Sequence, residues 1–212
     1  MSSAKVLLCQ ASEQLGISLT EQQQTQLLDY AVELEKWNKT YNLTAVRQFE
    51  AIIKRHLIDA LSVVPYVQSL SPKTLADIGT GGGIPGIILA IVLPGLQVDL
   101  VESIGKKCRF LRHVVNRLHL DERVSVQQIR VENWQINSPR CIIICRAFTS
   151  LENFTTITRH LGDQHSYWLA MKSAQTGDEE SRLPADFKFI ANQRLMVPFA
   201  AAKRHLLVFK RE

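Results

Sequence analysis

The chain has 212 residues, 46% of them hydrophobic, and its formal net charge is +5. This length and composition predict one core domain with a modest extension, and they exclude a disordered or fibrous chain. The small positive charge favours an anionic partner. Since no apolar run approaches the ~20 residues of a membrane span, we expect no membrane span and no secretory signal.

Residues 1–72 are predicted to form a helical extension that packs on the core. Thr20 and Gln23 form a capping box at the start of one helix. The apolar residues of that helix recur every three or four positions, at Leu27, Ala31, Leu34 and Trp37. A second helix is expected at 50–64, where Pro65 ends or kinks it.

Residues 73–212 show alternating strand and helix patterns and are predicted to form the core domain. Strands are expected at 74–78, 97–101, 124–129, 141–147 and 167–172, with helices at 85–92, 105–118 and 151–161. This alternation predicts an α/β fold with a mostly parallel sheet and helices on both faces. The segments 187–197 and 205–210 have no helix between them, so we expect an antiparallel pair at the end of the sheet.

A glycine-rich turn follows the first expected strand, with Gly79, Gly81, Gly82 and Gly83 close together. Glycine allows positive φ and lets bare backbone approach a ligand. Glu102 lies nineteen positions after Gly83, which is the spacing of a carboxylate that binds ribose hydroxyls. This pattern predicts a nucleotide-cofactor site, and the alternative is a tight structural turn without a ligand.

Asp77 indicates which nucleotide cofactor binds. Residues 81–86 also fit the dinucleotide pattern G-x-G-x-x-G. Asp77, two residues before the first glycine, is expected at the mouth of the pocket, where its charge would repel a pyrophosphate. A carboxylate there suits S-adenosylmethionine, which carries a sulfonium and an ammonium group and no phosphate.

The cysteines and histidines give no sign of a metal or a disulfide. No C-x-x-C pair occurs among the four cysteines, which are expected to be reduced core residues. The six histidines have no metal-ligand spacing, so we expect no metal.

These motifs resemble a known family. The glycine turn with Glu102 is similar to that of the bacterial 16S ribosomal RNA guanine-N7 methyltransferase family, also called glucose-inhibited division protein B. Further segments resemble it at 37–44, 55–59, 130–132, 146–148 and 204–206. The resemblance extends from about residue 17 to the end. Two departures from the family pattern, Cys145 and Ser173, lie near expected strand ends and leave the loop geometry there less defined.

The resemblance implies a cytoplasmic class I methyltransferase with a Rossmann-like fold. It would transfer a methyl group from S-adenosylmethionine to N7 of a single guanine, guanine 527, of 16S rRNA. The family contacts the cofactor at the positions of Gly79, Ile84, Val131, Glu132 and Arg146. The residue patterns above add Asp77, Gly81, Gly83 and Glu102 to the cofactor site.

Arg146 is also the candidate catalytic residue. We expect it to hold the cofactor or guanine O6 in position, and the alternative is a structural salt bridge at a strand end. Because guanine N7 is already nucleophilic and loses no proton, no general base is expected.

Basic residues are expected to contact RNA phosphates, and the alternative is a merely solvated basic face. The candidates are Arg47, Arg55, His56, Lys106, Lys107, Arg109, Lys172 and Arg204. The expected partner is 16S rRNA or the small ribosomal subunit, and the protein is expected to be a monomer.

Two other functions fit parts of the pattern. A nicotinamide-dependent oxidoreductase is disfavoured by Asp77, by the antiparallel ending and by the lack of an evident proton-donor pair. An RNA-binding module with an inactive cofactor site is disfavoured because Asp77, Gly79, Gly81 and Glu102 are all present.

Overall fold

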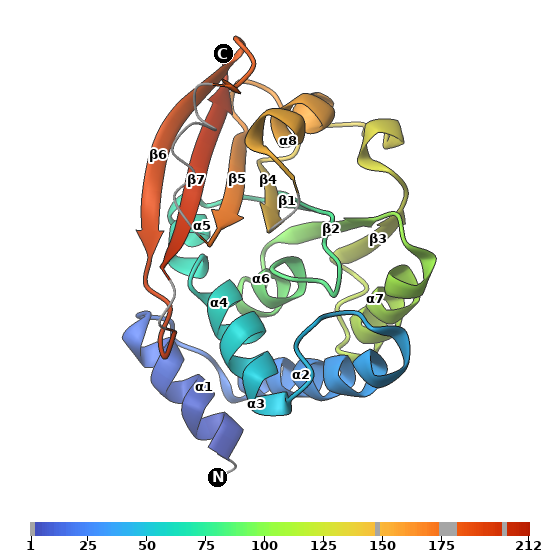
Figure 1. Ribbon diagram of the computed structural model, residues 1–212, viewed down its shortest axis with the longest axis vertical. Coiled ribbons are helices and arrows are strands. Elements are labelled where there is room, and N and C mark those ends of the chain that lie inside the picture. The colour runs from blue at the N-terminus through green and yellow to red at the C-terminus, as the bar shows by residue number, and fades with distance from the viewer. Residues whose placement is uncertain (1–2, 147–148, 174–181, 201–202) are drawn as a thin grey trace.

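A computed structural model describes residues 3–146, 149–173, 182–200 and 203–212. Its centre is a seven-stranded sheet of order β3-β2-β1-β4-β5-β7-β6 with helices on both faces (Figure 1). The strands are β1 (Thr74–Ile78), β2 (Gln97–Glu102), β3 (Val124–Gln128), β4 (Ile142–Arg146), β5 (Tyr167–Lys172), β6 (Phe187–Leu195) and β7 (Arg204–Arg211).

The pairing of the strands confirms the predicted sheet. β3, β2, β1, β4 and β5 pair in parallel, and β7 runs antiparallel to both β5 and β6. The strand order reverses between β1 and β4, because the chain adds β2 and β3 on one side of β1 and later strands on the other. A crevice at such a switch point is the usual place for a ligand in this class of sheet.

Helices before and between the strands cover the sheet. Those before it are α1 (Ser3–Gln14), α2 (Glu21–Tyr41), α3 (Phe49–Ile52), the π-helix η1 (Ile53–Ile58), α4 (Asp59–Leu61) and α5 (Val64–Ser69). Those that follow are α6 (Gly86–Val92), α7 (Gly105–Arg117), η2 (Val131–Asn133), α8 (Leu151–Thr158) and η3 (Arg159–Leu161).

The predicted capping box at Thr20 is present, with the two reciprocal hydrogen bonds to Gln23 at 2.9 and 3.2 Å. The single helix expected at 50–64 is instead broken into α3, η1 and α4. Pro65 lies in the first turn of the separate helix α5, where its missing N–H removes no helical hydrogen bond.

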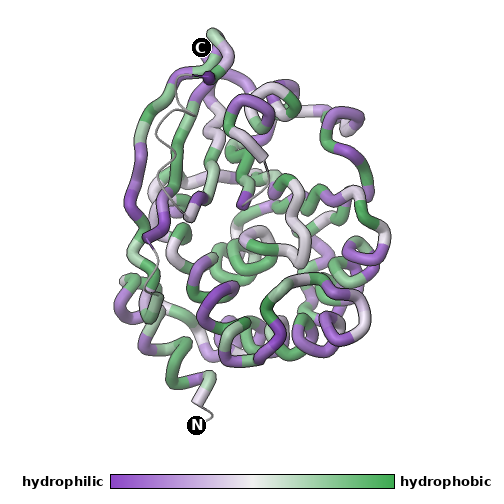
Figure 2. The backbone as a smooth tube through the Cα atoms, in the orientation of Figure 1, coloured by the Kyte–Doolittle hydropathy of each residue, from purple (hydrophilic) through white to green (hydrophobic). Residues whose placement is uncertain are grey.

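Buried apolar residues form one cluster on each face of the sheet. Successive strand residues face opposite sides, so Leu75 belongs to the larger cluster and Ala76 to the smaller. The larger cluster joins α2 to α6 and α7, and the smaller contains Phe154 of α8. Figure 2 shows the hydrophobic segments gathered in the central strands and in α6, all of whose residues are buried.

Side chains of α2 tie the N-terminal helices to the core. Gln23 Nε2 donates hydrogen bonds to the carbonyl oxygens of Ile91 and Val92, at 3.0 and 3.1 Å. The hydroxyl of Tyr30 donates to the carbonyl of Gly82 at 2.7 Å, so α2 supports the glycine turn directly.

None of the described helices is both long and apolar enough to cross a membrane. Within the described ranges, no group of three or more potential metal-binding side chains occurs. The four cysteines are all free thiols.

Candidate functional site

Two pockets lie side by side at the carboxyl ends of the parallel strands. The first, of about 330 Å³, lies at the ends of β1, β2 and β3, and the second, of about 290 Å³, lies at the ends of β4 and β5 and the start of β7. Ile78 of β1 pairs with Cys145 of β4, so the next residues, Gly79 of the first pocket and Arg146 of the second, stand at neighbouring strand ends. The two pockets therefore meet at the switch point of the sheet.

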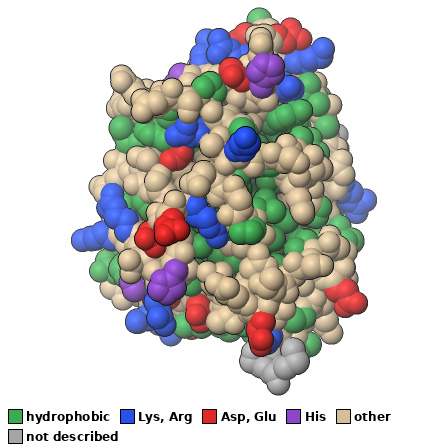
Figure 3. Space-filling view, turned by 180° about the vertical axis from the view of Figure 1, so that it is seen from behind, with side chains coloured by type: hydrophobic (Ala, Val, Ile, Leu, Met, Phe, Trp, Pro, Cys, Tyr) green, Lys and Arg blue, Asp and Glu red, His purple; other side chains and the backbone are tan. Residues whose placement is uncertain are grey.

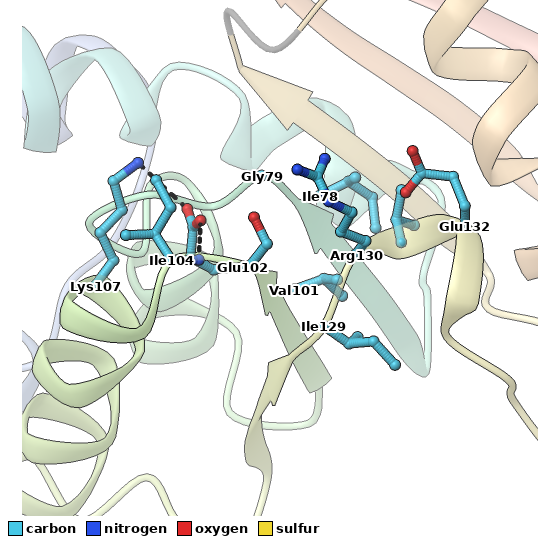
Figure 4. Close-up of a pocket in the computed structure, with 11 residues that line it drawn as sticks. Ile78, Gly79, Val101, Glu102, Ile104, Lys107, Ile129, Arg130 and Glu132 are labelled. Carbon is cyan, nitrogen blue, oxygen red and sulfur yellow. Dashed lines mark hydrogen bonds and ion pairs between the residues drawn. The ribbon is translucent and has the colours of Figure 1, made fainter.

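The first pocket combines an apolar middle with charged groups at both ends. Figure 4 shows Lys107, Ile104 and Glu102 on one side, Arg130 and Glu132 on the other, and aliphatic side chains between them. The residues that line it are Ile78, Gly79, Val101, Glu102, Ser103, Ile104, Lys107, Ile129, Arg130, Val131 and Glu132.

Glu102 is the buried acid of this pocket, whereas Glu132 is exposed. Glu102 ends β2 and is only 5% exposed. Its Oε2 accepts hydrogen bonds from Gly81 N at 3.1 Å and Lys107 Nζ at 3.4 Å, and its Oε1 accepts one from Ile104 N at 2.9 Å. A carboxylate has about four acceptor sites, so these three contacts hold Glu102 in one orientation and leave about one site for a ligand hydroxyl.

The glycine turn is built for a close approach but not for a phosphate. Gly79 and Gly81 have φ of 63° and 61°, which other residues rarely adopt. Their N–H groups already donate to Val101 O at 2.9 Å and to Glu102.

The helix that follows the turn offers no phosphate site either. Pro85, immediately before α6, has no N–H, and Gly86 N donates to Asp77 at 2.8 Å. The backbone donors that a dinucleotide site directs at pyrophosphate are therefore used inside the protein.

Asp77 lies beneath the turn, so the prediction that it stands at the mouth of the pocket is wrong. It is fully buried, and its Oδ2 accepts hydrogen bonds from Thr80 Oγ1 at 2.6 Å and from Gly86 N. Its Oδ1 is buried without a hydrogen-bond partner among the described residues. Burial raises the pKa of Asp77 to about 6.

Gly83 and Ile84, predicted to contact the cofactor, also lie outside the pocket wall. Both are buried, and Ile84 belongs to the larger apolar cluster. The chain turns inward after Gly81 to begin α6, which faces the core along its whole length. Of the predicted cofactor residues, Gly79, Glu102, Val131 and Glu132 line the first pocket, and Gly81 is held by Glu102.

The second pocket is predominantly cationic. Its lining comprises Asp59, Arg146, Met171, Lys172, Ser173 and Arg204. Asp59 is 2% exposed. Its Oδ2 accepts a hydrogen bond from Arg146 Nη1 at 3.2 Å, and its Oδ1 accepts one from Arg204 Nε at 2.5 Å. Lys172 Nζ donates to the carbonyl of Thr149 at 3.0 Å. Among the described residues of this lining, three cations face one carboxylate, which suits an anionic ligand. Arg146, predicted to contact the cofactor, lies here and pairs with Asp59.

His56 is not the RNA-binding cation that was predicted. It is 6% exposed, and its Nε2 is 2.7 Å from the hydroxyl of Thr44. Burial and the nearby guanidinium of Arg146 lower the pKa of His56 to about 4, so it is neutral at neutral pH. Lys107, also predicted to contact RNA, lines the first pocket beside Glu102.

The other predicted RNA contacts separate into two groups. Lys172 and Arg204 line the second pocket. Arg47, Arg55, Lys106 and Arg109 are exposed. Seen from behind, the molecule carries lysine and arginine side chains interspersed with acidic and apolar ones (Figure 3). Charge on that face alone therefore does not define an RNA surface.

Sequence reasoning missed several residues of the two pockets. Ile104, Ile129 and Arg130 line the first pocket, and Asp59 lines the second. The signal for the first three was their place just after the second and third strands, because parallel strands end at one edge of the sheet. Asp59 lies in a helix 87 positions from Arg146 and gave no strand-end signal, although it falls in the segment 55–59 that resembles the family.

Comparisons with known proteins agree with this geometry. A family model described as rRNA small subunit methyltransferase G matches residues 23–207. The chain is 49% identical over 201 residues to the ribosomal RNA small subunit methyltransferase G of Pseudomonas entomophila strain L48, covering 95% of this chain and 92% of that protein. The protein of the same name from Pseudomonas aeruginosa strain LESB58 is 45% identical over 204 residues, with 96% and 94% covered.

Among solved structures, the Bacillus subtilis M1A22 tRNA methyltransferase TrmK superimposes with a TM-score of 0.59. The identity is 12%, and the match covers 73% of this chain and 65% of that one. This likeness shows a shared fold.

Proposed function

The chain belongs to the rRNA small subunit methyltransferase G family, and from this membership we propose that it transfers a methyl group from S-adenosylmethionine to N7 of one guanine of 16S rRNA. The membership also confirms the family resemblance found in the sequence motifs. We place the reaction in the cytoplasm and propose a monomer as the active form. The observation that carries the proposal is the meeting of a pocket that holds the buried carboxylate of Glu102 and a cationic pocket at one switch point.

The residues of the first pocket fit S-adenosylmethionine. Its volume lies within the range of small-molecule sites. Glu102 offers one open acceptor site for a ribose hydroxyl, and a second hydroxyl would replace the 3.4 Å contact of Lys107. The aliphatic side chains of Val101 and Ile129 suit an adenine ring. The carboxylates of Glu102 and of buried Asp77 lie against the glycine turn and favour a cation over a diphosphate there, while Lys107 and Arg130 stand at the two ends of the pocket. When bound, S-adenosylmethionine supplies an electrophilic methyl group.

The second pocket is our proposed site for the target guanine. An arginine that approaches this base can donate to O6, and Arg146 stands at the strand end next to Gly79. Lys172 and Arg204 carry charge for the adjoining phosphates. Since N7 attacks through an in-plane lone pair, these residues need only orient the base and exclude water. Neutral His56 adds no cation beside the ring, whose positive charge increases during transfer.

The exposed basic residues are proposed to hold the surrounding RNA. Arg55 is adjacent to His56, and its carbonyl oxygen is 3.4 Å from Arg146 Nη1, so this part of the chain borders the second pocket. Lys106 and Arg109 lie in α7, whose first turn also carries Lys107 of the first pocket. Phosphate contacts on both sides would place the RNA across the two pockets.

Labelled S-adenosylmethionine tests the proposal directly. It is incubated with small ribosomal subunits from cells that lack the protein, and the modified nucleotide is mapped. Transfer to N7 of one 16S rRNA guanine is expected, and labelling of another atom or of another RNA would contradict the proposal.

Calorimetry separates the two alternative functions. We expect S-adenosylhomocysteine to bind and NAD not to bind. Tight NAD binding without a response to S-adenosylhomocysteine would favour an oxidoreductase. RNA binding without methyl transfer would favour an inactive module.

A further inference from the structure

Asp59 joins three separate parts of the fold at the second pocket. It begins α4 directly after the π-helix η1, while Arg146 ends β4 and Arg204 begins β7. β4 and β7 are not neighbours, because β5 lies between them. The carboxylate therefore bridges two arginines that no strand pairing holds together.

The contacts of Asp59 fix the direction of both guanidinium groups. Each carboxylate oxygen receives one nitrogen, Nη1 of Arg146 at 3.2 Å and Nε of Arg204 at 2.5 Å. A guanidinium has five N–H donors in a rigid plane, so one fixed bond leaves further donors for a ligand. Asp59 is 2% exposed, whereas the side chains of Arg146 and Arg204 are 22% and 26% exposed. A ligand in this pocket would thus meet the arginines more readily than the acid.

His56 of the π-helix and Asp59, the residue after it, both contact the guanidinium of Arg146. A π-helical turn carries more residues than an α-helical one and is frequent at functional sites. His56 Nδ1 lies 3.5 Å from both terminal nitrogens of Arg146, so the residues of this turn and Asp59 surround one guanidinium. The segment thereby supplies one wall of a pocket whose other residues come from the sheet.

We propose, on the basis of the function proposed above, that Asp59 is a positioning residue for the RNA substrate. It holds Arg146 and Arg204 at a fixed separation and neutralises the repulsion between them. The two arginines then receive the target nucleotide, one at the base and one at its phosphate. Asp59 itself does not contact the RNA.

The test compares Asp59→Asn with Asp99→Asn. Asp99 accepts a hydrogen bond from Arg140 Nε at 2.6 Å, which gives a matched aspartate–arginine pair outside both pockets. For each variant we would measure kcat and KM with unmodified small subunits, the affinity for S-adenosylhomocysteine, and the thermal midpoint. The wild-type protein in the same assay reports separately on the proposed function, because an inactive wild type would refute that function whatever the variants do.

We expect Asp59→Asn to raise KM for the small subunit about tenfold, the equivalent of one charge-assisted hydrogen bond. Its affinity for S-adenosylhomocysteine should stay within about twofold, and Asp99→Asn should leave KM unchanged. Asp59→Glu, which keeps the charge, should recover part of the loss. Equal KM values for Asp59→Asn and Asp99→Asn in an active wild-type background would overturn the assignment.

A double-variant cycle checks that Asp59 acts through the arginines. If it does, adding Asp59→Asn to Arg204→Ala should weaken RNA binding by less than Asp59→Asn does alone. Fully additive losses, measured by direct binding of small subunits without turnover, would show that Asp59 acts independently of Arg204 and would refute the positioning role.

Discussion

Asp77 and His56 are buried ionisable groups whose pKa shifts give opposite dependences of stability on pH. Burial raises the pKa of Asp77 from 3.8 to about 6, so the folded protein binds this proton more tightly than the unfolded chain does. The stability from Asp77 is therefore fully present below pH 3.8 and is lost as pH rises through about 6. At about 1.4 kcal/mol per pKa unit, the loss is about 3 kcal/mol.

His56 changes in the other direction. Burial and Arg146 lower its pKa from 6.5 to about 4, so its stability is present above pH 6.5 and is lost as pH falls through about 4. The magnitude is again about 3 kcal/mol. Between about pH 4 and pH 6.5 the contributions of Asp77 and His56 to the free energy of unfolding change in opposite directions. The pH profile of the wild-type protein alone therefore shows neither of them.

Replacing Asp77 by asparagine should separate them. We expect the free energy of unfolding of Asp77→Asn, minus that of the wild type, to rise by about 3 kcal/mol from about pH 4 to pH 7. For His56→Gln the same difference should fall by a similar amount. Urea unfolding at a series of pH values gives both profiles, and taking differences cancels all other titrating groups. Parallel profiles for Asp77→Asn and wild type would refute the burial argument.

Three further predictions concern the turn, the first pocket and the RNA surface. Glu102→Gln should weaken S-adenosylhomocysteine binding about ten- to hundredfold in calorimetry, because one acceptor oxygen becomes a donor; an unchanged affinity would remove Glu102 from the ribose site. Gly83→Ala should lower the free energy of unfolding by about 2 kcal/mol, since φ is +91° and the new Cβ would lie 2.4 Å from Ile87. Gly95→Ala is the control, because a Cβ at Gly95 meets nothing within 4 Å. Equal losses of unfolding free energy in the two variants would contradict the steric argument for Gly83. Lys106→Glu with Arg109→Glu should weaken RNA binding and flatten its salt dependence without changing cofactor affinity; an unchanged salt dependence would make α7 a solvated face.

The sequence predicted the sheet well because its signals are local. β1 and β5 have the expected bounds, since apolar runs between turns define buried strands. The antiparallel ending followed from the missing helix before β7. The position of Glu102 in the pocket followed from its spacing after the glycine turn. The division of the chain at residue 72 stays a prediction.

The errors came from tertiary contacts that no local pattern reports. The environment of Asp77 depends on Gly86 N, nine positions later, and the turn between them closes over its side chain. Arg204 pairs with Asp59 across 145 positions, so neither residue predicts the other. The π-helix likewise breaks a segment whose apolar pattern indicated one continuous helix.

The hydrogen bonds from α2 to the core set a limit on how this protein can be shortened. Tyr30 braces the loop that shapes the first pocket, and Gln23 closes the last turn of α6. A fragment starting at Thr74 would keep every strand. It would expose the apolar face of α6 that α2 covers, and the glycine turn would lose its hydrogen bond from Tyr30. Insertions and fusions are better tolerated away from the contact of α2 with α6 and the glycine turn. A shortened enzyme should therefore keep α2.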